Sequence, residues 1–177
     1  MNTVVDTTHY AYGDISRLPD GSYEIIDGER REMTPTGFEH GRLEGRFFEI
    51  LSRHVKDKGY VAVGEVGILI SKQPLRIRAA DVVYLSKEKA RQQPKGILEI
   101  APDLVIEIIS ESNTSWEMND KIKDYLAIGV EKIFLVDPQT MTASLYQKGK
   151  KEALLYNFED DIPLLEGLIF KLRELLS

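Results

Sequence analysis

The sequence predicts a single domain of the α/β or α+β class, with a central mixed β-sheet flanked by helices. The chain has 177 residues, a length that favours one domain with its own hydrophobic core. Strand-like apolar runs alternate with two segments whose apolar residues recur at helical spacing. This order of hairpin, helix, three strands, helix and further strands is typical of a sandwich around one sheet. Residues 1–17 are expected to be flexible or peripheral.

The N-terminal half begins with a predicted hairpin and a long helix. Residues 22–33 alternate in polarity around the turn signal Asp27-Gly28, which predicts a β-hairpin with two short strands. Residues 37–59 are interpreted as a helix that ends at the glycine in position 59. Within it, Glu44 and Glu49 are assigned to the solvated face.

Three strands are predicted to form the centre of the sheet. Residues 60–70 contain two glycines, so a bend or bulge is expected in this first strand. Residues 77–86 form the second strand and are followed by a polar loop. The third, residues 103–110, is apolar on both faces, which favours a central position in the sheet.

A second helix and a C-terminal group of strands complete the expected fold. Thr114 and Glu117 have the spacing of a capping box, which predicts a helix start there, and Gly129 is a good terminator. Strands are expected at 132–138, 142–150 and 152–158, the last at an edge, before a closing segment at 167–176 in which a helix is one interpretation.

Composition excludes several classes of site. The chain has no cysteine, so disulfides, thiolate metal sites and cysteine nucleophiles are excluded, in keeping with the reducing cytoplasm. No apolar run is long enough to cross a bilayer, and a signal peptide pattern is absent. The net charge of −6 argues against general coating of nucleic acid.

Between Lys72 and Lys95, however, the sequence has seven basic residues and only two acidic ones, Asp81 and Glu88, which gives a local charge of 7 − 2 = +5. This stretch is either a binding surface or a solvated loop and strand edge.

Three acidic residues interrupt the apolar strands: Glu65, Asp81 and Glu107. A buried charge is costly unless it is paired or binds a metal. Two carboxylates on central strands can converge on a hard cation such as Mg²⁺, which prefers oxygen ligands. The alternative is a structural ion pair with arginine or lysine, or a loop cap. Three acids on successive strands, followed by a helix that carries lysine, favour a site.

Lys121 and His40 are the further candidates. Lys121 shares one strip of its helix with Glu117 and Tyr125, so it either reaches inward past the sheet or forms an ordinary surface pair with Glu117. His40 begins the first long helix and either contacts substrate or metal or is a partly exposed polar residue. Trp116 is expected to be a packing residue in preference to a base-stacking platform. No glycine-rich phosphate loop, zinc pattern or nucleophile elbow is present.

Five segments carry a family resemblance; in order along the chain they are YEIIDGERREMTPTGFEHGRLEGRFFEIL, GEVGILI, RAADVVYLS, APDLVIEIISES and KIKDYLAIGVEKIFLVDP. Together they resemble the Uma-two family, whose members are expected to be endonucleases. That family is placed in the PD-(D/E)xK restriction endonuclease-like superfamily. The resemblance covers nearly the whole chain from about Leu18 and implies a restriction endonuclease-like core with an N-terminal hairpin.

The resemblance also implies roles for individual residues. The metal-binding aspartate of the motif falls on Asp81, preceded by Ala80 where the superfamily usually has proline. The second acid falls on Glu107, and Ile109 stands where the motif lysine is usual. Members of this family instead have a lysine in the following helix, at Lys121.

The same resemblance places an acid of the preceding strand at Glu65 and a histidine of the first helix at His40. It implies a Mg²⁺- or Mn²⁺-dependent endodeoxyribonuclease that acts on DNA. Cleavage of both strands of a duplex favours a homodimer, and the absence of cysteine favours the cytoplasm. The metal would be held by Asp81 and Glu107, and Glu65 and Lys121 would assist catalysis. His40, Arg76, Arg78 and Lys87 are the expected substrate-binding residues.

Two other functions remain open at this point. One is a catalytically inactive nucleic-acid-binding or regulatory module with the same fold. The other is a metal-dependent hydrolase of a small phosphoester. Fold alone does not separate these functions, because one fold hosts many.

Overall fold

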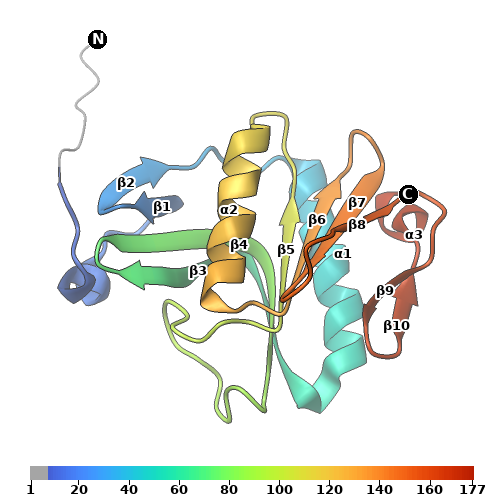
Figure 1. Cartoon of the computed structure of the whole chain (residues 1–177), viewed down its shortest axis with the longest axis horizontal. Coiled ribbons are helices and arrows are strands. Elements are labelled where there is room, and N and C mark those ends of the chain that lie inside the picture. Colours follow the sequence, from blue (N-terminus) through green and yellow to red (C-terminus); the bar gives the residue numbers. More distant parts are fainter. Residues whose placement is uncertain (1–7) are drawn as a thin grey trace.

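A computed structural model describes residues 8–177 and shows an eight-stranded sheet with helices on both faces (Figure 1). The strands are β1 (Tyr23–Ile26), β2 (Glu29–Glu32), β3 (Gly59–Lys72), β4 (Leu75–Ser86), β5 (Leu104–Ile108), β6 (Lys132–Asp137), β7 (Thr142–Gln147) and β8 (Leu154–Tyr156). Their order is β2-β1-β4-β5-β6-β7-β8, and β3 pairs with β4 outside this path. All pairs are antiparallel except β5 with β6, which are parallel. The predicted mixed sheet is therefore confirmed.

The two long helices pack on opposite faces of the sheet (Figure 1). Helix α1 (Phe38–Val55) buries Phe47 and Leu51 in one cluster with Ile106 of β5. Helix α2 (Ser115–Ile128) buries Ile122 in another cluster with Val105. Because neighbouring residues of a strand point to opposite faces, β5 contributes to both cores and is buried at all five of its positions. This confirms its predicted central place.

The local turn and cap signals act as the sequence predicts. Asp27 and Gly28, with φ of 54° and 86°, connect β1 to β2, as expected for the type of turn that favours Asp-Gly in tight hairpins. Thr114 and Glu117 form the capping box that begins α2. Gly129 ends that helix with a φ of 93°, a conformation that costs glycine little.

The first long helix is shorter than predicted, since α1 ends at Val55 and a 3-10 turn, η2 (Lys56–Lys58), precedes β3. A second 3-10 helix, η1 (Tyr12–Arg17), lies in the N-terminal segment, where Tyr12 and Ile15 pack against the core near β1. The uncharged side chains of this segment thus contribute to a small third cluster.

The C-terminal region differs from the sequence prediction. The predicted edge strand at 152–158 narrows to β8, and a separate hairpin of β9 (Ile162–Leu165) and β10 (Leu168–Phe170) precedes the short helix α3 (Leu172–Leu176). Phe170 of this hairpin packs edge to face on Phe47 and Phe134, at centroid distances of 6.2 and 6.1 Å. The hairpin escapes sequence analysis because its strands are short and contain a proline, and this tertiary contact stabilises them.

Candidate active site

The site lies where β4 and β5 separate. The backbone pairing of the two strands ends at Val82 and Ile106. Beyond that pair, the side chain of Asp81 in β4 accepts a hydrogen bond from the backbone of β5. Its Oδ2 accepts a hydrogen bond from the backbone N–H of Ile108 at 2.6 Å. A buried backbone donor is thereby satisfied, and the carboxylate is fixed at the fork with Oδ1 directed to helix α1.

Helix α1 supplies two further ligating groups. The Nε2 atom of His40 lies 3.3 Å from Oδ1 of Asp81 and 3.2 Å from Oε1 of Glu44. One ligand atom from each of these three residues lies within 4.8 Å of the others. Histidine and glutamate four residues apart share one helix face, so α1 presents both to the fork.

The assignment of Glu44 to the solvated face is wrong, because its side chain is buried. Glu44 precedes Phe47 by three residues and Leu51 by seven, which places it on the same stripe as these core residues. The stripe and the histidine four residues earlier were the signals in the sequence that could have identified it. Glu49, by contrast, pairs with Arg53 in an exposed position.

The protonation of His40 reflects its two acidic neighbours. Burial opposes the charged imidazolium, but hydrogen bonds to Asp81 and Glu44 and the charge of both carboxylates outweigh burial. Together they raise the pKa of His40 from 6.5 to about 10. The imidazolium therefore balances negative charge at this position.

This donor set fits a divalent cation. Two carboxylates and an imidazole suit Mn²⁺, and the carboxylates also suit Mg²⁺. The negative charge of Asp81 and Glu44 is balanced by the imidazolium of His40, whose proton can be exchanged, and not by a lysine or arginine. Such a proton must be released when histidine becomes a metal ligand.

Glu107 lies on the α2 side of the same fork and has different partners. Its Oε2 accepts a hydrogen bond from Nζ of Lys121 at 2.8 Å, and its Oε1 accepts one from the hydroxyl of Tyr125 at 2.6 Å. Lys121 also donates to the carbonyl of Ala79 at 2.9 Å and lies 3.4 Å from Oε1 of Glu24. Lys121 thus reaches inward, and the alternative of a surface pair with Glu117 is excluded by its burial.

The buried pair of Glu107 and Lys121 has two opposed titration tendencies. Burial raises the pKa of Glu107 to about 7, even though Lys121 lowers it. Burial also disfavours charge on Lys121, but the carboxylates of Glu107, Glu24 and Asp81 outweigh burial and raise its pKa to about 12. The neighbouring carboxylates therefore favour the charged ammonium of Lys121, whereas burial opposes the charge of Glu107.

Glu65 sits in a bulge of β3 at the rim of the site. The register of β3 against β4 shifts between Val63 and Val66, and Glu65 has a φ of 58°, so the expected bend is present. Glu65 and Glu44 line one hollow. Within residues 8–177 the Glu65 carboxylate makes no hydrogen bond or ion pair, and it lies outside the close cluster of His40, Glu44 and Asp81.

Arg76 and Arg78, expected to contact DNA, face acidic side chains of the protein itself. The Nε atoms of both arginines donate to Asp124 of α2, at 2.7 and 2.6 Å, and both guanidinium groups also bond Asp120. Arg78 is only 5% exposed and donates to Glu24 at 2.8 Å as well. This network joins β4 to α2 beside Lys121.

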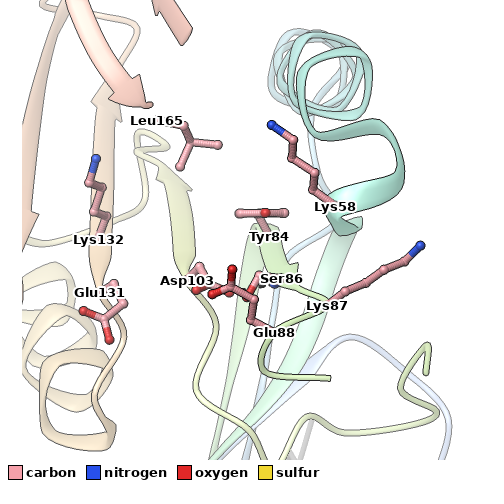
Figure 2. A pocket seen from close by; sticks show the side chains of 9 residues that line it. All are labelled: Lys58, Tyr84, Ser86, Lys87, Glu88, Asp103, Glu131, Lys132 and Leu165. Atoms are coloured by element: carbon pink, nitrogen blue, oxygen red, sulfur yellow. Dashed lines mark hydrogen bonds between the residues drawn. The ribbon is translucent and has the colours of Figure 1, made fainter. Parts of the chain in front are cut away.

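Lys87 lies at the other end of the β4–β5 pair from Glu107. It follows Ser86 at the end of β4 and lines a hollow together with Lys58 and Asp103. Figure 2 shows the Lys87 side chain extending away from the other labelled residues. The structure therefore brings Asp81, Glu107, Lys121 and His40 together and leaves Lys87 apart.

A sheet that forks at two carboxylates, covered by one helix on each face, belongs to the restriction endonuclease-like class of folds. The chain belongs to the Uma2 family, described as "Putative restriction endonuclease", whose family model matches residues 11–174. The predicted family and fold are thus confirmed.

A solved structure of similar fold supports the same class. It is described as "a putative nuclease belonging to DUF820" from Anabaena variabilis. The two chains are 18% identical and superpose with a TM-score of 0.82, over 95% of this chain and 98% of the other. The comparison with curated proteins gives no match. None of the helices in the described part of this chain has the length and apolarity needed to span a membrane.

Proposed function

We propose that this protein is a metal-dependent endonuclease that hydrolyses phosphodiester bonds of DNA with Mg²⁺ or Mn²⁺. The observation that carries the proposal is the convergence of two sets of groups at one fork. His40, Glu44 and Asp81 meet on the α1 side, and Glu107 with Lys121 lies on the α2 side. A cation-binding set beside a buried lysine suits the chemistry of a phosphate ester.

Asp81 and Glu107 are the proposed strand ligands of the metal, with Glu44 and His40 as ligands from α1. A bound divalent cation would lower the pKa of a coordinated water and neutralise charge on the scissile phosphate. The Ile108 N–H keeps the Asp81 carboxylate oriented for this role. Tyr125 does the same for Glu107.

Lys121 is proposed to stabilise negative charge that develops on the phosphate. Its ammonium group is held by Glu107, Ala79 and Glu24, so no reorganisation is needed to present a positive charge at the fork. Glu65, whose carboxylate has no partner among residues 8–177, is proposed to assist from the hollow that it lines with Glu44. For Arg76 and Arg78 we propose a structural role in holding α2, in place of the DNA contact expected from sequence.

The direct test is cleavage of plasmid and linear DNA with and without Mn²⁺, using Asp81→Asn and Glu107→Gln. Both folded variants should lose cleavage by at least about 100-fold, as expected when electrostatic stabilisation of the transition state is removed. The matched control is Glu49→Gln, which neutralises an exposed acid of α1 and should keep full activity. Undiminished cleavage by both site variants would contradict the proposal.

One observation favours a second function, a nucleic-acid-binding or regulatory module without turnover. Both oxygens of Glu107 are already engaged, by Lys121 and Tyr125, as they would be in a purely structural ion pair. Calorimetric titration with Mn²⁺ separates the two functions, since a module without turnover need not bind the metal through Asp81. The homodimer and the cytoplasmic location stay predictions.

A further inference from the structure

Trp116 is exposed in a way that the fold does not explain. It is the single tryptophan of the chain and lies in the first turn of α2, with 66% of its surface exposed. Among residues 8–177, no hydrogen bond to its indole and no ring contact is present. The apolar face of α2 consists of other residues, Met118, Ile122 and Tyr125. The expectation that Trp116 is a packing residue is therefore wrong.

Phe38 is a second unpacked aromatic residue, at the start of α1 and 87% exposed. It lines the hollow that contains Glu44 and Glu65. In Figure 1, α1 and α2 begin at the same edge of the molecule, where β5 also ends, with one helix on each face of the sheet. The first turns of the two helices, which carry Phe38 and Trp116, thus lie at the edge where β5 ends, and Phe38 lines a hollow with Glu44 of the candidate active site.

The charges around this edge suit single-stranded nucleic acid, which has a lower charge density, better than a duplex. Arg76 and Arg78 are occupied by acidic side chains, and the chain carries a net charge of −6. Arg31 of β2 is exposed, makes no ion pair with residues 8–177, and lies close enough to Glu117 to lower the pKa of that carboxyl. Because the guanidinium of Arg31 has no acidic partner among residues 8–177, its charge is available to a phosphate. A duplex surface would call for several such cations.

Stacking explains an exposed aromatic residue beside such a site. Aromatic side chains stack on bases whose faces are free, and this contact tolerates any base. In an intact duplex the base faces are stacked on one another and only their edges reach the grooves. Platforms of this kind therefore recognise unpaired nucleotides.

We propose that Trp116 and Phe38 stack unpaired nucleobases on the two sides of the bond to be cleaved. The substrate class is then nucleic acid with single-stranded or frayed nucleotides at the cleavage site, and Arg31 contacts the phosphate next to the base on Trp116. This inference rests on the proposed nuclease function for the nature of the ligand. It does not depend on turnover.

The single tryptophan gives a direct measurement. The wild-type protein is titrated, in the presence of a chelator that prevents cleavage, with a short oligothymidylate or with a blunt duplex of equal length. Trp116 emission should be quenched saturably by the single strand and little by the duplex. Unchanged emission, at concentrations where a labelled oligonucleotide is bound by anisotropy, overturns the proposal. Equal quenching by the duplex overturns it as well.

Variants test the same point without fluorescence of the protein. Trp116→Ala and Phe38→Ala should each weaken binding of the labelled single strand by about 5- to 150-fold, the equivalent of about 1–3 kcal/mol per stacked base. Phe48→Ala is the matched control, since Phe48 is an exposed aromatic residue of α1 outside the hollow. It should leave binding unchanged, and an equal loss in all three variants overturns the proposal.

The outcomes separate this inference from the proposed function. Saturable quenching by single strands without any metal-dependent cleavage supports the stacking platforms and contradicts the nuclease. Metal-dependent cleavage of blunt duplex without quenching contradicts the platforms and leaves the nuclease in place.

Discussion

Asp81 and Glu107 stand on neighbouring strands at one fork, yet their charges are balanced in opposite ways. Asp81 faces His40 and Glu44, where the positive charge is a proton that histidine can release. Glu107 faces Lys121, where the positive charge is fixed. If the proposed function holds, the α1 side would exchange its proton for a metal, whereas the α2 side holds the lysine charge next to it.

Removing Lys121 tests the fixed side and should have the largest effect. Lys121→Met leaves the Glu107 carboxylate buried without its cation, so we expect a loss of about 3–5 kcal/mol in the free energy of unfolding. Urea denaturation measures this loss. In the double variant with Glu107→Gln the loss should be smaller, because no charge then remains unpaired. A double variant that only adds the two single losses would show that the pair is not coupled.

Metal binding tests the exchangeable side. A cation that binds only the folded state at 100 times its Kd should stabilise the protein by about 2.7 kcal/mol. Thermal unfolding with Mn²⁺, and again after a chelator, measures this gain. Asp81→Asn and Glu44→Gln should lose the gain, and Glu49→Gln should retain it. If Glu107→Gln retained the full stabilisation by Mn²⁺, Asp81 would be a metal ligand and Glu107 would not.

The N-terminal cap of α2 fixes the start of the helix that carries Lys121. The Thr114 hydroxyl accepts a hydrogen bond from the N–H of Glu117 at 3.2 Å, so Thr114→Ala should cost about 1 kcal/mol. Chemical denaturation of this variant beside Ser112→Ala, a nearby exposed hydroxyl outside the helix, measures the cost of the cap. Equal stabilities of the two variants would contradict a stabilising cap.

The smallest expected effect is the contribution of Glu117 to the pH dependence of the free energy of unfolding. Hydrogen bonds from the N–H and hydroxyl of Thr114 lower the pKa of the Glu117 carboxyl below 4.5 in the folded state. Its contribution is therefore present above pH 4.5 and is lost as pH falls through the lowered value. Since Glu117 is exposed, we expect a change of a few tenths of a kcal/mol by analogy with other surface charges. In Glu117→Gln, denaturation measured from about pH 6 down to about pH 3 should lack this component.

The sequence was sufficient for the elements whose signals are local. Asp27-Gly28 specified the hairpin, Thr114 and Glu117 the start of α2, and the apolar run around Glu107 the central strand. It was insufficient for the β9–β10 hairpin, whose short strands depend on Phe170 packing against distant rings.

The candidate site follows the same division. An acid within an apolar strand marks Glu107 as a residue that needs a partner, and the position of Lys121 on α2 offers one. Glu44 was misassigned although its helical stripe was legible, because glutamate is rarely buried. Arg78 looked like part of a free basic stretch, but Asp124 pairs with it from 46 residues away.

The sequence by itself therefore determined the strands and helices that have local signals, and it marked Glu107 as a charge that would have to be satisfied in the interior. Periodicity, turn residues and caps act over a few neighbouring residues and are legible in the chain. Only the tertiary structure decided which charges meet: Asp81 with His40 and Glu44, Glu107 with Lys121, and Arg78 with Asp124. Electrostatic pairing depends on distance in space, and folding sets that distance independently of separation along the chain.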